Sequence, residues 1–296
     1  MRTVAVVLHY GDPAATARCV ASLAGQCEPL VVDNGTGTYP ADLALPENRG
    51  FAGGMNAGAA LAFARGADAV LLVNNDAVLD AGCVAALAAS GADLAAPTIV
   101  HGLPPAAGPL WYAGGTLSRL TGEVRHRGGA TFLTGCVLWI RREAWLALAR
   151  RPSPPPPLTR PCGAPSPAGR GELGALDERF FLYHEDADLC WRAADAGLRL
   201  AWVPAARAWH EGGAATGSQA RKAPALDYYD ARNGLLLLRT HLAGPRLALA
   251  VAWWAGVRLP RKAARLLLRG PRRAGLRAVA AGLRDGLAGR TGPWQP

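Results

Sequence analysis

The chain is poor in cysteine, and the six cysteines among its 296 residues form neither a CxxC pair nor a metal-binding spacing. Scattered cysteines in a chain of this size indicate buried thiols in a reducing compartment. The 36 glycines and 23 prolines follow no period, which excludes a fibrous protein. The start, MRTVAVVLHYGDP, has one arginine and too short an apolar run for a signal peptide. We therefore expect a cytoplasmic protein.

Two nucleotide-binding signatures are also absent. A dinucleotide oxidoreductase needs GxGxxG after a strand, and the nearest candidate, GTGTYP at 35–40, fails at its last position. A sugar nucleotidyltransferase would need a glycine-rich basic loop directly after the first strand, where this chain has LHYGDPAA. The sequence therefore disfavours a dinucleotide oxidoreductase, whereas a sugar nucleotidyltransferase remains an alternative.

Acidic residues are almost absent from the C-terminal segment. Residues 239–296 hold twelve Arg or Lys and one acid, Asp285, so they carry +11, whereas the preceding 238 residues carry −1. The body is neutral, and the tail alone makes the protein basic. Because half of its residues are hydrophobic, the chain can bury a full core and form one large domain plus an appendage.

Apolar strands and helical segments alternate in the first hundred residues. Asp12 and Pro13 are typical of the cap and first turn of a helix. The alternation predicts an α/β fold with a mostly parallel sheet and helices on both faces. The expected strands cover 3–8, 29–34, 68–76 and 93–100, and the expected helices cover 12–25, 48–66 and 81–91.

Three of these strands end in polar side chains: His9 and Tyr10, Asp33 and Asn34, and residues 74–76 (NND). Asn and Asp are common in solvated turns, because they bond their own backbone there. Parallel strands, however, end at one rim of the sheet, where open α/β sheets bind their ligands. The convergence of the three polar ends favours a ligand site over three unrelated turns.

The second half of the chain is less regular. Residues 111–145 indicate hairpin strands and a short helix, with the strand FLTGCVLWI (132–140) interrupted by Gly135. The proline-rich stretch 151–172 predicts a flexible surface insert rather than a domain boundary. An acidic turn, a helix ending at Gly197 and a short strand follow within 176–204.

Two groups of carboxylates are candidates for chemistry. Asp76 at a strand end suits Mg2+ or Mn2+, which take one or two protein carboxylates together with phosphate oxygens. Glu185 and Asp186 follow the apolar run FFLY, which draws them toward the interior. Asp188 is explained by an i,i+4 pair with Arg192, worth on the order of half a kcal/mol.

Several motifs occur in the order VVDNG, NRGFAGGMN, LLVNNDA, FLTGCVLWIRRE, LDERFFLYHEDADLCWRAADAGLRLAWVPAARAWHEGG and YYDARNGLLLL. This order resembles the family 2 glycosyltransferases of the GT-A fold, and most closely their bacterial rhamnosyltransferase-like branch. The likeness covers about residues 3–240, and we expect residues 1–240 to form one GT-A domain.

The resemblance implies a nucleoside diphosphate sugar, dTDP- or UDP-linked, bound across the strand ends. It assigns Asp33 to the base edge and the loop of Asn48, Arg49 and Gly50 to the nucleotide. Further candidates for substrate contact are His9, Tyr10, Asn34, Asn56, Asn75, Thr134, Gly135, Glu185, Trp191 and Arg192.

The resemblance also implies a metal site and a general base. Asp76 takes the last place of the metal-binding DxD position, where Asn74 and Asn75 leave only one carboxylate. His210, which in isolation would be a structural or surface residue, becomes a metal or diphosphate contact. Asp186 becomes the general base, and Mg2+ or Mn2+ the cofactor.

Inverting sugar transfer requires a base and a cation arranged in this way. One carboxylate takes the proton of the acceptor hydroxyl, and a cation stabilises the departing diphosphate. No second catalytic carboxylate is needed, unlike in glycoside hydrolysis. Near a helix N-terminus, Asp186 is expected to stay ionised at neutral pH, as a base must.

Residues 241–296 predict a basic amphipathic helical tail. Its longest uncharged run, Leu247 to Val257, has 11 residues and is too short to span a bilayer. Basic and apolar residues together with Trp253 and Trp254 favour a helix lying on an anionic membrane. A helix packed on the body and a nucleic-acid patch are the alternatives, and we expect no nucleic-acid partner.

The expected function is inverting transfer of a sugar, rhamnose by the resemblance, to a glycan or polyprenyl-linked acceptor. Cell-envelope polysaccharide synthesis at the inner face of the plasma membrane would suit such an acceptor. A non-enzymatic membrane or nucleic-acid adaptor would explain the tail, but it would leave the ordered acidic motifs unused.

Overall fold

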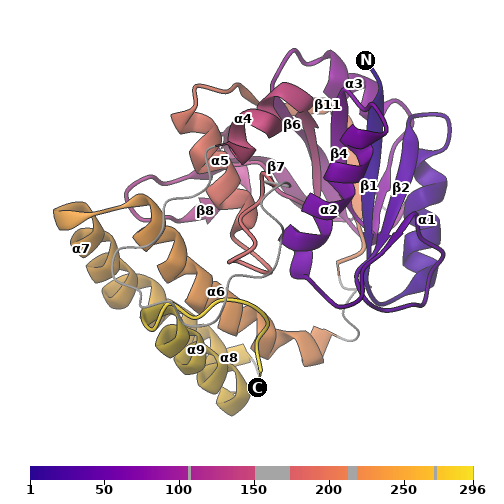
Figure 1. The fold of residues 1–296 in the computed structure, drawn as a ribbon. Coiled ribbons are helices and arrows are strands. Elements are labelled where there is room, and N and C mark those ends of the chain that lie inside the picture. The colour runs from indigo at the N-terminus through magenta and orange to yellow at the C-terminus, as the bar shows by residue number, and fades with distance from the viewer. Residues whose placement is uncertain (106–107, 151–173, 213–218, 270–271, 296) are drawn as a thin grey trace.

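The computed structural model describes residues 1–105, 108–150, 174–212, 219–269 and 272–295. An α/β part contains the sheet, and the C-terminal helices form a block beside it (Figure 1). The proline-rich insert expected at 151–172 lies outside the described residues. The described cysteines are free and four of the five are buried, as expected.

The strands of the described chain form one sheet. They are β1 (Thr3–His9), β2 (Glu28–Asp33), β3 (Leu43–Ala44), β4 (Ala69–Asn74), β5 (Ala77–Leu79), β6 (Leu94–His101), β7 (Leu110–Leu117), β8 (Val124–Arg125), β9 (Arg127–Ala130), β10 (Val137–Arg141) and β11 (Leu200–His210). Their order is β3-β2-β1-β4-β10-β6-β11-β5, with β7 joined to β6, and β8 and β9 joined to β7.

The predicted parallel arrangement is confirmed for the first half of the chain. β3, β2, β1 and β4 pair in parallel, and so do β6 and β11. β10 is antiparallel to both β4 and β6, between which it lies. The fold is therefore the expected α/β class, with an antiparallel strand inserted from the second half.

Helices cover both faces of the parallel strands. Right-handed crossovers that run in opposite directions along the sheet place α1 (Pro13–Leu23) and α2 (Gly50–Ala64) on opposite sides. A Cβ at Gly58 of α2 would lie 2.3 Å from Val6 Cγ1, so this glycine lets the helix approach β1 closely. The other helices of this part are α3 (Cys83–Ala89), α4 (Arg142–Ala149) and α5 (Glu185–Asp195).

The strand predicted at 132–140 is shorter than expected, because β10 starts only at Val137. The residues before it form a turn, in which Thr134 Oγ1 accepts the Cys136 N–H at 3.3 Å. The Gly135 N–H donates to the Asp186 carboxylate at 3.1 Å, so this N–H bonds to α5 and not to a neighbouring strand. β11, by contrast, has 11 residues and is longer than the short strand expected there.

The predicted C-terminal helices are present. α6 (Gln219–His241) crosses the boundary expected at 240/241 and packs along α9 (Arg272–Leu287). Between them, α7 (Gly244–Trp253), a π-helical turn η2 (Trp254–Arg258) and α8 (Leu259–Arg269) follow one another directly. Within the described ranges, no helix combines the length and the hydropathy that crossing a bilayer requires.

Candidate active site

The polar ends of three strands meet at one rim of the sheet, as predicted. His9 is opposite Asp33 in the register of β1 and β2, and Leu8 is opposite Asn74 in that of β1 and β4. Asp76 follows two residues after the end of β4. The rim therefore gathers side chains from three neighbouring strands.

Both carboxylate oxygens of Asp33 accept hydrogen bonds at the end of β2. Oδ1 accepts the Thr36 hydroxyl and the Thr36 N–H, the latter at 3.0 Å, and Oδ2 accepts the Gly37 N–H. Burial alone raises the pKa of Asp33, but these hydrogen bonds and the nearby His9 outweigh burial and lower it. The result is an ionised carboxylate fixed at the strand end.

The loop of Asn48, Arg49 and Gly50 is anchored by Asn34. The Asn34 amide donates to Asn48 Oδ1 at 3.0 Å, and its oxygen accepts the Arg49 N–H at 2.9 Å. Gly50 has a φ of +73°, and a Cβ there would lie 2.3 Å from the carbonyl oxygen of Phe181. Asn34 and Asn48 therefore shape the loop.

Arg49 and Asn56 both contact Glu178, which sequence analysis did not single out. Arg49 Nη2 lies 3.1 Å from Glu178 Oε2, and the Asn56 amide donates to Glu178 Oε1 at 3.1 Å. Asn56 is buried and also donates to the carbonyl oxygen of Leu176 at 2.9 Å. These bonds tie α2 to the segment before α5, so they give Asn56 a structural role. In the sequence, the charged residues of the LDER motif at 176–179 were the signal that could have pointed to Glu178.

His9, Tyr10 and Asn75 line the rim next to α1. His9 Nδ1 lies 2.7 Å from Thr16 Oγ1, and its Nε2 lies 2.8 Å from Thr38 Oγ1. Asn75 donates to Thr16 Oγ1 at 3.0 Å. Burial lowers the pKa of His9, which keeps its ring neutral at pH 7. Tyr10 is 39% exposed, and of the three it is the side chain most open to a ligand.

Asp76, in the turn between β4 and β5, meets His210 of β11 at the rim. His210 is the last residue of β11 and lies opposite Ala77 of β5. Its Nε2 is 3.2 Å from Asp76 Oδ1, and both side chains are mostly buried. Two ligands at right angles around one Mg2+ are about 3 Å apart, so this spacing lets both atoms contact a single ion.

The two side chains fit a divalent cation that is shared with a bound diphosphate. No cluster of three or more His, Cys, Asp or Glu side chains suited to an ion occurs in the described part of the chain. Phosphate oxygens and water would therefore complete the shell around Asp76 and His210. Burial alone lowers the pKa of His210, but Cys136 and Asp76 raise it, so an arriving cation would displace a proton from the ring.

Asp186 lies in the first turn of α5, as predicted, and two backbone groups hold it. The Gly135 N–H donates to Oδ2 at 3.1 Å, and the Ala187 N–H donates to Oδ1 at 2.8 Å. Burial raises the pKa of Asp186 above its ordinary value, although these bonds and the nearby His184 and His126 oppose the shift. The helix position alone predicted an ordinary ionised carboxylate, because desolvation is invisible in the sequence.

Glu185 is more deeply buried than Asp186. Burial, followed by the charge of Asp186, raises the pKa of Glu185 far above its ordinary value. Its Oε2 is buried without a hydrogen-bond partner in the described structure. This environment favours the protonated form of Glu185, which cannot accept a proton, and leaves Asp186 as the better base.

The turn before β10 connects the region of Asp76 and His210 to the proposed base, Asp186. The Asn74 N–H, two residues before Asp76, donates to the Cys136 carbonyl oxygen at 2.9 Å. Gly135, the residue before Cys136, donates to Asp186. Asp76 therefore lies two residues from Asn74, which bonds to this turn at Cys136, and Asp186 bonds to the same turn at Gly135.

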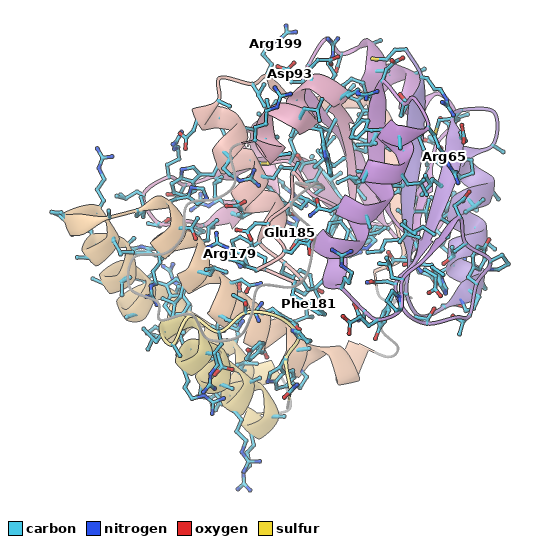
Figure 2. The ribbon with its side chains drawn as sticks, in the orientation of Figure 1. Arg65, Asp93, Arg179, Phe181, Glu185 and Arg199 are labelled. Carbon is cyan, nitrogen blue, oxygen red and sulfur yellow. The ribbon has the colours of Figure 1, made fainter. Side chains whose placement is uncertain are left out.

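The segment leading into α5 has an unusual backbone. Phe181, Tyr183 and His184 have φ values of 63°, 65° and 72°, a region that costs roughly 1–3 kcal/mol per residue and is common at active sites. Figure 2 shows Phe181 and Glu185 at the boundary between the α/β part and the C-terminal helices. From α6, the amide nitrogen of Asn233 lies 2.7 Å from the Tyr183 carbonyl oxygen.

Asn233 and its neighbour Arg232 are positioning residues that sequence analysis missed. Both are buried, and both donate to the Phe180 carbonyl oxygen, at 2.9 Å and 2.7 Å respectively. They hold the strained segment in place from α6. The signal was present in YYDARNG, where two polar residues stand directly before an apolar helical run.

Asp188 and Arg192 pair as predicted, but in the interior. Arg192 Nε donates to Asp188 Oδ2 at 2.8 Å, and His241 Nε2 lies 2.8 Å from Oδ1. Arg192 also donates to the Ala175 carbonyl oxygen, and Trp191 is buried and stacked on His241. The expected worth of half a kcal/mol is therefore too small. These contacts occupy Trp191 and Arg192, and we leave both out of the proposed substrate site.

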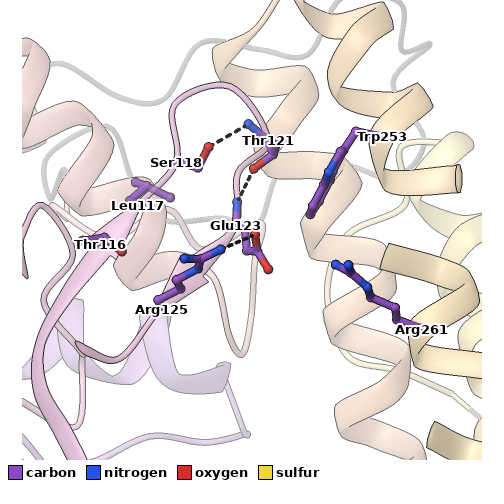
Figure 3. Close-up of a pocket in the computed structure, with 8 residues that line it drawn as sticks. All are labelled: Thr116, Leu117, Ser118, Thr121, Glu123, Arg125, Trp253 and Arg261. Carbon is purple, nitrogen blue, oxygen red and sulfur yellow. Dashed lines mark hydrogen bonds and ion pairs between the residues drawn. The ribbon is translucent and has the colours of Figure 1, made fainter. Parts of the chain in front are cut away.

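A separate pocket of about 510 Å³ lies between the β7–β8 hairpin and the helices α7 and α8. Trp253 and Arg261 face Arg125 and Glu123 across it (Figure 3). None of the residues predicted for the active site lines this pocket.

No protein-family model and no curated protein sequence matches the chain. Among solved structures, it is similar to S. aureus TarS 1-349 in complex with UDP-GlcNAc, with a TM-score of 0.54 and 14% identity over 98% of this chain and 81% of that chain. It is also similar to GalNAc-T7 with UDP, GalNAc and Mn2+, with a TM-score of 0.50 and 12% identity over 91% of this chain. The chain spans only 58% of the GalNAc-T7 chain. These likenesses concern the fold, and they confirm that the chain has the predicted GT-A glycosyltransferase fold.

Proposed function

We propose that the chain is an inverting glycosyltransferase that moves a sugar from a UDP- or dTDP-sugar to a hydroxyl group of a glycan or polyprenyl-linked acceptor. The observation that carries this proposal is the contact of Asp76 with His210 where the parallel strands end, next to a turn whose Gly135 N–H donates to Asp186. The UDP and UDP-GlcNAc in the two similar structures support a nucleotide sugar as donor. The motif order supports rhamnose as the sugar and cell-envelope polysaccharide as the product.

The proposed residues divide the work of a single displacement. The acceptor oxygen attacks the anomeric carbon while its proton passes to the Asp186 carboxylate. The bond between the sugar and the diphosphate breaks, and its electron pair leaves with the diphosphate. Asp33 and Arg49 position the nucleotide. Asp76 and His210 would hold Mg2+ or Mn2+, which neutralises the charge of the leaving diphosphate when bound.

Replacing Asp76 by alanine tests the metal site. In the presence of Mn2+, we expect Asp76→Ala to bind UDP or dTDP more than about tenfold more weakly than the wild type, because cation neutralisation of phosphate charge is worth several kcal/mol. Isothermal titration with and without Mn2+ measures the effect. Asp80→Ala, four residues further along, is the matched control and should bind normally. Unchanged Mn2+-dependent affinity in Asp76→Ala would refute the assignment.

The pH dependence of turnover tests the base. Transfer needs Asp186 ionised, so kcat/KM should be full above the pKa of this group and fall as the pH drops through it. Because burial raises that pKa, the loss should begin at a higher pH than for an ordinary aspartate, whose pKa is about 3.9. A pH–rate profile of the wild type measures it. Activity that stays constant down to about pH 4 would contradict this prediction.

The products separate this function from the nucleotidyltransferase alternative. A glycosyltransferase releases a nucleoside diphosphate, whereas a nucleotidyltransferase releases pyrophosphate. Thermal shifts with UDP, dTDP and their sugars, each with and without Mn2+, should first identify the donor, because a ligand of the native state raises the apparent stability. Pyrophosphate as the only product would overturn the proposal.

A further inference from the structure

The helical run 244–269 carries an uncharged stripe on its exposed side. The stripe contains residues three or four apart that are all exposed: Leu249, Ala252, Gly256, Pro260, Ala264 and Leu268. Four-residue steps overshoot the 3.6-residue turn of an α-helix, and the wider π turn at Trp254–Arg258 offsets this drift. The six residues therefore stay on one side of the run.

The opposite side of the same run is buried. Ala250 is 1% exposed and Trp254 is 3% exposed, four residues apart, and both belong to the hydrophobic core. The run is thus held on the protein by one face. Leu249 and Leu268, on the other face, are 63% and 80% exposed, and Leu267 beside them is 49% exposed. The run therefore presents three exposed leucines on its outer side.

Positive charge borders the stripe. Arg258 and Lys262 are held by carboxylates of α6, with Lys262 Nζ 2.6 Å from Asp230 Oδ2. Arg246 and Arg265, in contrast, are exposed and have no ion-pair partner among the described residues. Arg261 is also exposed, but it lines the pocket between α8 and the β7–β8 hairpin, where it faces Glu123 and Arg125 (Figure 3). No acidic residue occurs anywhere within 244–269.

We infer that this stripe, together with Arg246 and Arg265, docks the protein on the surface of an anionic lipid bilayer. A bilayer uses both features, because the leucines enter the boundary between headgroups and acyl chains while the arginines contact anionic headgroups. Nucleic acid would use the arginines and leave the leucines exposed. A second copy of the chain would bring two basic faces together. The inference does not depend on the proposed activity.

The full chain should float with vesicles that contain about 30% phosphatidylglycerol in phosphatidylcholine, and binding to pure phosphatidylcholine should be much weaker. Replacing Leu249, Leu267 and Leu268 together by Glu should lower the partition coefficient by at least about a hundredfold. Replacing Arg246 and Arg265 together by Gln should lower it by roughly 25-fold, since each arginine near an anionic surface contributes about fivefold.

The matched control is Leu287→Glu on α9. Leu287 is 66% exposed but lies outside the stripe, so this variant should bind within about twofold of the wild type. All the substituted side chains are exposed, and circular dichroism with a thermal melt checks that each variant is folded. UDP binding should survive in all of them, whatever the outcome with vesicles.

Three results would overturn the inference. The first is a wild type that does not float with anionic vesicles. The second is a leucine variant that floats as well as Leu287→Glu does. The third is a sedimentation-velocity experiment in which the wild type dimerises and the leucine variant does not, which would assign the stripe to a second copy of the chain.

Discussion

Asp186→Asn is expected to lose roughly a hundred- to ten-thousand-fold in turnover, which is what removing a positioned general base typically costs. Asparagine keeps the shape of the side chain, so its amide can stay beside the turn at Gly135 while it no longer accepts a proton. Donor binding should be unchanged, because neither Asp76 nor His210 is touched. Single-turnover kinetics together with nucleotide titration separate the two effects.

The same substitution has an expected effect on stability. Because burial raises the pKa of Asp186, the folded protein holds this proton more tightly than the unfolded chain does. At pH values above the folded pKa, the ionised group therefore lowers the free energy of unfolding. A neutral asparagine removes that cost, but its NH2 group cannot accept one of the two backbone N–H bonds that Asp186 accepts. The two effects oppose each other, so the Tm of Asp186→Asn should stay close to that of the wild type at pH 7.

Asp195→Asn is the control on the same helix. Asp195 lies at the end of α5, is half-exposed and pairs with Arg119 at the surface. We expect near-normal turnover from it. If Asp186→Asn retained near-normal turnover as well, the base would lie elsewhere, and Glu185→Gln would be the next variant to measure.

Local patterns in the sequence were enough to place the rim of the site. Apolar runs ending in His9, Asp33 and Asn74 predicted three neighbouring strands, and the register confirms that they end together. The reason is that a strand and the polar residues at its end are consecutive in the sequence, so one local pattern reveals both. The start of α1 was equally readable, since Asp12 accepts the Ala14 N–H at 2.9 Å.

Features that depend on distant parts of the chain were not readable. Asn233 on α6 donates to the carbonyl oxygen of Tyr183, fifty residues earlier. The motif YYDARNG marks the polar residue, but no local pattern identifies its partner. The turn at Gly135 looked like part of a strand because its residues are apolar, whereas its N–H bonds to α5. Burial is likewise a property of the packed molecule, and it raises the pKa of Asp186 above the ordinary value expected from its helix position.

Asp188→Asn is expected to lower the free energy of unfolding by about 3–5 kcal/mol, the cost typical of breaking a buried ion pair from one side. Asp188 is fully buried and bonds to Arg192 and to His241. An amide would leave the guanidinium of Arg192 in the interior without a compensating charge. Urea unfolding at pH 7 measures the loss, and Asp195→Asn should lose at most about 1 kcal/mol, as exposed pairs do.

A double variant shows whether the uncompensated charge is the cause. Asp188→Leu with Arg192→Met removes both charges and keeps most of the volume, so it should recover much of the stability that Asp188→Asn loses. A double variant as unstable as the single one would mean that the bonds to Ala175 and His241, and not the charge pair, hold α5 in place. Asp186 and Asp188 would still have different roles in that case. The first is held by backbone groups beside the rim and can give up its charge without harm to the fold, whereas the second is part of the packing that keeps the first in position.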